Sequence, residues 1–187
     1  MTKRPNKKPG RFKKEDREFE QKLVDLSRVT RVTKGGKQLS FRATMVIGDK
    51  KGRVGFGIGK SSDVSTAISK GVKMAKKALI SVPINNETIP HELVVKSGAG
   101  KVLLKPAKQG KGIKAGGAMR IAFELAGIPN ITGKILGSNN KINILYATFA
   151  ALKKLRKPIE KKNKEEKKEE EQKNKKTEEL KKEPKNE

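Results

Sequence analysis

One stretch decides the fold: Arg53-Val54-Gly55-Phe56-Gly57-Ile58-Gly59. Its valine, phenylalanine and isoleucine favour a β-strand, and successive side chains of a strand point to opposite faces. Glycine at every second position therefore leaves one face without side chains. Glycine inside a strand marks a place where another backbone or a ligand comes close. The sequence thus predicts that either a packed helix or a bound ligand lies on this face.

The segment after this strand predicts a helix. Ser61, Ser62 and Asp63 all offer suitable N-cap residues. Small and apolar residues recur at helical spacing on one face: Val64, Ala67, Ile68, Gly71, Val72, Ala75, Ala78 and Leu79. Four lysines lie off that face: Lys70, Lys73, Lys76 and Lys77.

Two further strands are predicted before the glycine-rich one, at residues 23–29 and 39–47. Residues 33–37 contain Gly35-Gly36, which tolerates positive φ and predicts a loop, and residues 48–52 predict a hairpin turn. The order is strand, strand, strand, helix. Residues 1–22 form an expected N-terminal extension, with a basic arm at 1–14 and a short polar helix at 15–22.

The second half predicts strands at 92–96 and 101–105, a glycine- and lysine-rich loop at 106–117 and a helix at 118–126. A strand at 131–136 and a last helix follow, the helix capped by Asn139 or Asn140. Its expected inner face is Ile142, Leu145, Phe149 and Leu152. The fold class is α+β with two small domains, 23–84 and 85–157, and a Lys/Glu-rich tail at 158–187 that is expected to be disordered.

Charge points to the partner. The 187 residues carry 46 Lys plus Arg against 20 Asp plus Glu, a formal net charge of +26, and a polyanion that loses its counterions on binding would relieve the resulting repulsion. An anionic membrane is a weaker candidate, since no apolar run approaches the roughly 20 residues of a spanning helix. RNA is thus the expected partner, and one of the two possible occupants of the glycine face.

The mode of recognition follows from the side chains present. Lysine suits phosphate contacts, whereas arginine is the better reader of bases, and lysine greatly outnumbers arginine here. Aromatic residues, which form stacking platforms for single strands, amount to six Phe, one Tyr and no Trp. Recognition of folded RNA through shape and phosphates is therefore expected.

Catalytic chemistry has little basis in the sequence. There is no cysteine and His91 is the only histidine, so we expect no enzyme activity, no metal and no cofactor. The six carboxylates of residues 23–157 form no pair at short helical spacing: Asp25, Asp49, Asp63, Glu87, Glu92 and Glu124.

Two glycine-rich segments suggest phosphate binding. Residues 55–61 fail the phosphate-loop pattern because Val54 stands where it needs glycine, and they fail the dinucleotide pattern at Lys60. Gly116-Gly117 before a helix is either an anion site made of free N–H groups or a plain helix start. The nearby cations in the sequence are Lys108, Lys111, Lys114 and Arg120.

Several motifs carry a family resemblance. In the first half they are the run 28–37 (Arg-Val-Thr-Arg-Val-Thr-Lys-Gly-Gly-Lys) and the runs 41–43, 46–49, 52–57 and 59–60. In the second half they are Gly110-Lys111-Gly112-Ile113, residues 115–120 and Gly137-Ser138-Asn139-Asn140. From Leu23 to Lys154 the chain resembles the bacterial fifth protein of the small ribosomal subunit.

The resemblance implies a first domain similar to a double-stranded-RNA-binding domain without its first helix, and a second domain of the family's own fold. Some small-molecule kinases share that second fold, but fold does not fix function. The implied function is that of a structural constituent of the small subunit in the cytoplasm. It would bind 16S-type rRNA where head meets body, help line the mRNA entry channel and support translational accuracy.

The resemblance also implies partners and sites. The partners are small-subunit rRNA, mRNA at the entry channel and the fourth and eighth small-subunit proteins; Gly112 and Arg120 match positions at the boundary with the fourth. The expected RNA-binding residues are Arg28, Arg31, Lys34, Gly35, Gly36, Lys37, Arg53, Lys60, Lys111 and Lys114.

Two other functions remain open. One is a free double-stranded-RNA-binding protein, although the lysine-rich helix start of such domains is missing, since Lys73, Lys76 and Lys77 come past the helix middle. The other is an enzyme such as a phosphotransferase.

Overall fold

The structure, a computed structural model, describes residues 19–156. The expected basic arm, residues 15–18 of the expected polar helix and the Lys/Glu-rich tail lie outside the described residues. Residues 20–22 of that expected helix instead belong to a strand, so the helix prediction is wrong for them. Their backbones pair with residues 46–48 of the next strand, and this pairing outweighs a polar local sequence that favours a helix.

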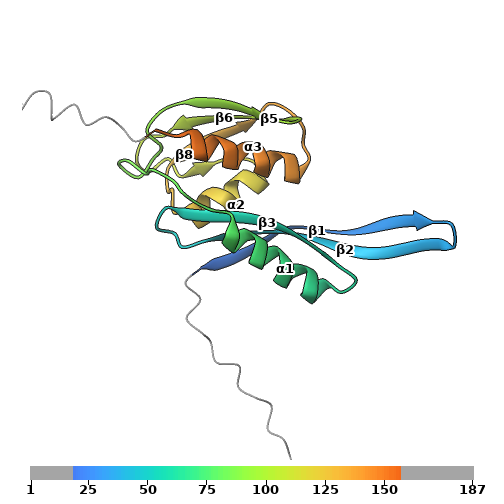
Figure 1. Cartoon of the computed structure of the whole chain (residues 1–187). Helices are drawn as coiled ribbons and strands as arrows, with labels where there is room; N and C mark the ends of the chain where they lie inside the picture. The colour runs from blue at the N-terminus through green and yellow to red at the C-terminus, as the bar shows by residue number, and fades with distance from the viewer. Residues whose placement is uncertain (1–18, 157–187) are drawn as a thin grey trace, which may run out of the picture. The chain divides into compact units, whose positions relative to one another are not determined.

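The first sheet is antiparallel and four-stranded. Its strands are β1 (Glu20–Thr33), β2 (Gly36–Gly48), β3 (Arg53–Ser61) and β4 (Leu79–Ser81), in the order β1-β2-β3-β4. Helix α1 (Val64–Lys77) follows β3 and lies along one face of the sheet (Figure 1). The predicted order of three strands and a helix is thus confirmed.

The end of α1 differs from the prediction. Leu79 was expected on the helix, but Ala78 caps α1 and is exposed. Leu79 then starts β4, where it pairs with Gly55 of β3. Strands as well as helices place apolar residues on their buried faces. An apolar residue at helical spacing, such as Leu79, therefore does not show by itself that the helix continues.

The glycine face of β3 is covered by α1. A Cβ atom added to Gly55 would lie 2.5 Å from the carbonyl oxygen of Ala75, and Cβ atoms on Gly57 and Gly59 would collide with the backbone near Gly71 and Ala67. Ala67, Gly71 and Ala75, one turn apart, are the buried residues of α1. The packed-helix prediction is confirmed, and RNA does not occupy this face.

The second sheet contains β5 (Leu93–Ser97), β6 (Gly100–Pro106), β7 (Ile113–Lys114) and β8 (Ile131–Ile135), in the order β5-β6-β8-β7. Only β7 and β8 run parallel. The sequence did not predict β7, a two-residue strand inside the glycine- and lysine-rich loop. Helix α2 (Gly117–Ala126) ends at Gly127 with φ +78°, and Asn140 caps α3 (Lys141–Lys154) through Ile142 N–H.

Helix α3 is buried on more than its predicted face. Leu145, Phe149 and Leu152 are buried as expected and Ile142 is half-buried, but further residues are buried as well: Ile144, Ala147, Thr148 and Ala151. The physical reason is that α3 packs against several elements: Ala147 lies against Gly100 of β6, and the buried apolar residues of α3 form one cluster with those of α2. Phe56 of β3 packs on α3, with its ring centroid 4.9 Å from that of Tyr146 and 4.6 Å from that of Phe149.

The turn between β2 and β3 contacts the end of α2. The backbone N–H of Lys50 donates to Leu125 O over 3.0 Å, and that of Gly52 donates to Ala126 O over 2.9 Å. These bonds satisfy carbonyl groups that a helix end leaves without partners. Buried side chains of both halves form one cluster that contains Val46 and Val54 together with Phe123 and Leu145.

No helix within residues 19–156 combines the length and the apolar character needed to cross a membrane.

Candidate nucleic-acid interface

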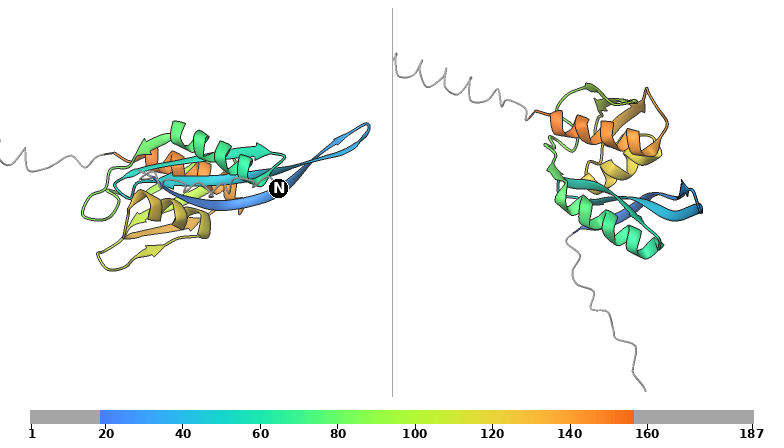
Figure 2. Two further views of the ribbon diagram at one scale, coloured as in Figure 1. Left: turned by 90° about the horizontal axis from the view of Figure 1, so that it is seen from below. Right: turned by 45° about the vertical axis from the view of Figure 1, so that its right-hand side comes forward.

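The β1–β2 hairpin extends past the third strand. β2 pairs with β3 only from Gly48 back to Phe41, whereas it pairs with β1 as far as Gly36. Residues 29–40 therefore form a two-stranded ribbon, which projects in every view (Figures 1 and 2). All residues from 30 to 39 are exposed, so they add little to a core and are free to contact a partner.

The tip of this ribbon is tighter than the predicted loop. Thr33 and Gly36 face each other as the last strand pair, so only Lys34 and Gly35 form the turn. Gly36 adopts φ +134°, which glycine tolerates, and the Thr33 hydroxyl donates to Gly36 O over 3.1 Å. A Cβ atom on Gly35 or Gly36 would meet nothing within 4 Å. The bare backbone of the tip is therefore open to a ligand.

The ribbon and its root carry positive charge on both faces. Arg28 pairs with Phe41 and Lys37 pairs with Val32, on the face that continues toward α1, whereas Arg31 pairs with Gln38 on the opposite face. Residues 28–40 contain no Asp or Glu. In the described part of the chain, no ion pair involves Arg28, Arg31, Lys34 or Lys37. A polyanion that surrounds the ribbon would therefore meet cations on either side.

The root of the ribbon is fixed by polar contacts. Lys141, the first residue of α3, donates to Asp25 Oδ1 over 2.6 Å, and the Ser27 hydroxyl donates to Asp25 Oδ2 over 3.1 Å. Arg42 in turn donates to the Ser27 hydroxyl over 3.1 Å. The hydrogen bond from Lys141 holds the pKa of Asp25 below its usual value, with help from Ser27. The ribbon thus starts from a position that α3 helps to hold.

Arg53 does not join the ribbon residues. It opens β3 at the far end of β2 from the tip, a strand of 13 residues that spans roughly 40 Å. Its Nε donates to Asp49 Oδ2 over 2.6 Å, and its guanidinium lies 5.2 Å from the Phe19 ring centroid. Burial alone would raise the pKa of Asp49, but bonds from Arg53 and from the Lys51 backbone lower it. Arg53 therefore has a structural role, in which it fixes the turn at Asp49.

Lys60 lies closer to the ribbon root. It is exposed and pairs with Arg42 across β2 and β3.

Lys111, Gly112 and Lys114 form a second group in the loop that contains β7. Gly112 has φ +72°, and its N–H donates to the side-chain oxygen of buried Asn130 over 3.1 Å. The carbonyl of Gly112 accepts from Ile131 N–H over 3.3 Å. Both lysines are exposed. Asn130 thus fixes the loop that carries both lysines. The sequence did not indicate this contact.

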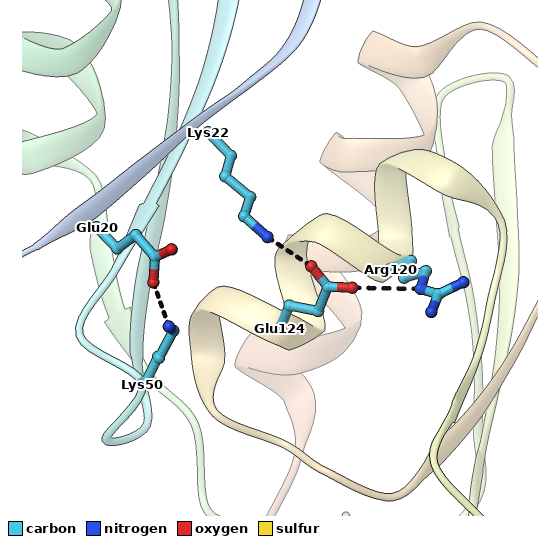
Figure 3. Close-up of polar contacts among 5 residues, drawn as sticks. All are labelled: Glu20, Lys22, Lys50, Arg120 and Glu124. Atoms are coloured by element: carbon cyan, nitrogen blue, oxygen red, sulfur yellow. Dashed lines mark hydrogen bonds and ion pairs between the residues drawn. The ribbon is translucent and has the colours of Figure 1, made fainter.

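Arg120 has a partner inside the chain (Figure 3). Its Nε donates to Glu124 Oε1 over 3.2 Å, while Lys22 of β1 binds Glu124 Oε2 over 2.7 Å. The hydrogen bond from Lys22 is the main cause that lowers the pKa of Glu124. The spacing of Arg120 and Glu124, four residues in one helix, was a usable signal; the pairing with Lys22 was not.

The predicted anion site at Gly116-Gly117 stays a prediction. Gly116 is the N-cap of α2 and offers no side-chain cap, which fits an anion site and a plain helix start equally well. Within residues 19–156, no three His, Asp or Glu side chains gather where they could hold a metal ion.

Comparison with known families gives two matches in sequence order. Residues 19–83 match the model of the ribosomal protein S5, N-terminal domain, and residues 95–165 match that of the ribosomal protein S5, C-terminal domain. Together the matches cover most of the chain, including the ribbon and the loop at Gly112. Their order agrees with the two sheets of the α+β fold. The chain therefore belongs to the ribosomal protein S5 family, and it is a structural, non-enzymatic constituent of the small ribosomal subunit that binds ribosomal RNA.

Proposed function

We propose that the chain binds small-subunit rRNA where the head meets the body of the subunit, and that the β1–β2 ribbon makes its most intimate contact. One observation carries this proposal: an exposed ribbon with cations on both faces, a bare glycine tip and no acid between residues 28 and 40. Lysine and arginine that meet phosphates release counterions, which drives binding at low salt. Such a ribbon suits insertion between RNA segments.

Incorporation into subunits tests the ribbon. Arg28, Arg31 and Lys34 are changed to Glu in a tagged chain that is expressed beside the resident protein. We expect this variant to disappear from the small-subunit peak of a sucrose gradient. The control reverses Lys96, Lys101 and Lys134, three exposed lysines of the second sheet, and is expected to stay in that peak. Equal sedimentation of the ribbon variant and the unchanged chain would refute the proposed contact.

The proposal extends to mRNA and to accuracy. A protein that lies by the entry channel influences decoding through the RNA and proteins that it positions. Its proposed protein neighbours are the fourth and eighth small-subunit proteins, and Gly112 and Arg120 face the fourth. Two observations support the boundary with the fourth protein. The loop at Gly112 is fixed by a hydrogen bond to Asn130, and Arg120 is exposed although its Nε donates to Glu124.

A stop-codon readthrough reporter tests this part. Arg120→Ala is expected to change readthrough several-fold while the subunit peak stays intact, because the change weakens a protein boundary and leaves RNA contacts in place. Lys105→Ala, which removes another cation that is paired with an acid, serves as the control. Unchanged readthrough with Arg120→Ala would remove this residue from the proposed boundary.

The structure gives no support to the alternative of a free double-stranded-RNA-binding protein. α1 begins at Val64 without a lysine before Lys70, so the helix start lacks the cations that such domains present. Sedimentation in high salt separates the two functions, since a free binding protein stays at the top of the gradient.

A further inference from the structure

A second basic surface lies between α1 and the end of β3. A groove with a volume of about 640 Å³ opens there. From β3 it is lined by Ile58, Gly59 and Lys60, and from α1 by Lys70, Lys73, Met74, Lys76 and Lys77.

The groove follows from the pairing of the sheet. β4 pairs only with residues 53–55 of β3, so β3 has an uncovered edge from Phe56 onward. The bare glycine face lets α1 lie close to that strand. The lysines that flank the buried face of α1 therefore lie next to the uncovered edge of β3. A short β4 and a glycine-rich β3 thus create the space together.

The charge of the groove is unbalanced. Five lysines and no acid line it, and within residues 19–156 none of the five takes part in an ion pair. Like charges that share a groove repel one another. A bound polyanion would remove that cost, and the apolar side chain of Met74, which is 53% exposed, supplies part of the lining.

Ordinary structural reasons explain only some of these lysines. Lys60 fits the protection of an uncovered strand edge against aggregation. Lys76 and Lys77 lie in the last turn of α1, where cations interact favourably with the helix dipole. Neither reason applies to Lys70 and Lys73, which leave the groove more positive than the fold requires.

We propose that this groove is a second ribosomal-RNA site, which holds the phosphodiester backbone of folded small-subunit rRNA. The inference rests on the proposed RNA-binding function. No aromatic side chain lines the groove, and unpaired strands are typically held by aromatic stacking, so a folded RNA fits better. Lysine without such stacking is suited to phosphate oxygens as a point charge.

The groove and the ribbon meet near Lys60 but extend in opposite directions. Gly59 packs beside Ala67 and Gly55 beside Ala75, so α1 runs from the end of β3 back toward its start. The ribbon extends the other way, past the end of β3. Two backbone contacts on one sheet fix the orientation of the protein on RNA, which a single contact does not.

Binding of the full chain to purified small-subunit rRNA, measured at several salt concentrations, tests this site. The variant is Lys70→Gln with Lys73→Gln; the matched control is Lys96→Gln with Lys134→Gln, which removes the same charge from exposed lysines elsewhere. Each lost phosphate contact lowers the slope of log K against log salt by about one. We expect a fall of about two for the groove variant and almost none for the control.

The outcomes separate the two proposals. If the unchanged chain ignores rRNA, the proposed function itself fails. If the chain binds but the groove variant and the control behave alike, the groove is not an RNA site. If the groove variant keeps its rRNA affinity yet no longer enters subunits, the groove holds an acidic protein segment and the inference is overturned. Met74→Glu, which adds an acid without removing a lysine, is expected to weaken rRNA binding about as much as the double variant.

Discussion

Lys22 of β1 and Glu124 of α2 stand 102 positions apart in the sequence and form an ion pair of 2.7 Å. Arg120 binds the other oxygen of the same carboxylate, and the Lys22 contact joins the first sheet to the second helix (Figure 3). The nearby pair of Glu20 and Lys50, at 2.5 Å, adds a second link at β1. The turn that contains Lys50 also bonds to the end of α2. The ribbon is therefore positioned by contacts that lie far from its tip.

Removal of the shared carboxylate tests this junction. Glu124→Gln keeps the shape of the side chain but loses both charged contacts. Half-exposed pairs contribute roughly 0.2–1 kcal/mol each, so we expect a loss of about 1 kcal/mol and a Tm lower by about 2–4 °C. Glu92→Gln, which breaks the exposed pair with Lys105, serves as the control and should shift Tm less. Calorimetry of both variants measures the difference, and equal shifts would show that the junction is not held by Glu124.

Acid should weaken the same junction. The pKa values of Glu124, Asp25 and Asp49 lie below their ordinary values of 4.5, 3.8 and 3.8. A carboxyl with a depressed pKa stabilises the folded state above its unfolded pKa, and this stabilisation is lost as the pH falls through the folded pKa. The free energy of unfolding is thus expected to stay level above about pH 5 and to fall progressively as the pH drops below 4.5, the ordinary value for Glu124.

Urea unfolding at several pH values measures this fall. Glu124→Gln, which has no carboxyl to titrate at this position, is expected to lose less stability over the same interval than the unchanged chain. An identical pH profile for both proteins would exclude Glu124 as a contributor.

The most informative part of the sequence for the first sheet was the alternating glycines of β3. Because Gly55, Gly57 and Gly59 alternate, they required a close neighbour, and the periodicity of residues 64–75 supplied one. β4 and β7 were missed because strands of three and two residues carry no period of their own. Residues 20–22 were mistaken for helix because their pairing with β2 is a tertiary effect that no local pattern encodes.

The candidate site was predictable in part. The cations and glycines of residues 28–37 marked the hairpin tip, and the structure places five of the predicted residues on the ribbon and Arg28 at its root. The ribbon projects from the sheet because β3 is shorter than β2. The charge pattern gives no information about where β3 ends. The groove lysines were visible only as residues off the apolar face of α1, because a groove needs the position of β3 as well.

Two glycines should differ in how much an alanine substitution costs. Gly57 has the backbone N of Ala75 2.5 Å from the position of an added Cβ, so Gly57→Ala must displace α1 and should cost about 1–3 kcal/mol. Gly35 has open space and no positive φ, so Gly35→Ala is expected to change stability by less than about 0.5 kcal/mol. Denaturant unfolding compares them; a stable Gly57→Ala would contradict the close helix contact.

The buried side chain of Asn130 should contribute to the stability of the protein and to the order of the loop around Gly112. Its side-chain oxygen accepts from Gly112 N–H and its amide donates to Glu87 over 3.4 Å. Asn130→Ala leaves the Gly112 N–H without this partner, which costs about 1–3 kcal/mol when such a group is buried. Lower stability and a faster hydrogen exchange of the loop around Gly112 are expected. Unchanged exchange would mean that the loop is held by its other contacts.

The two faces of the ribbon can be tested separately. Arg28 and Arg31 lie on opposite faces, so a ligand on one face only would feel one of them. If RNA surrounds the ribbon, Arg28→Gln and Arg31→Gln should each lower the salt slope of rRNA binding by about one, and the double variant by about two. Lys96→Gln, with an exposed cation on the second sheet, is the control. A slope that responds to only one arginine would place RNA on that face alone, and the ribbon would then lie along the RNA surface instead of between two RNA segments.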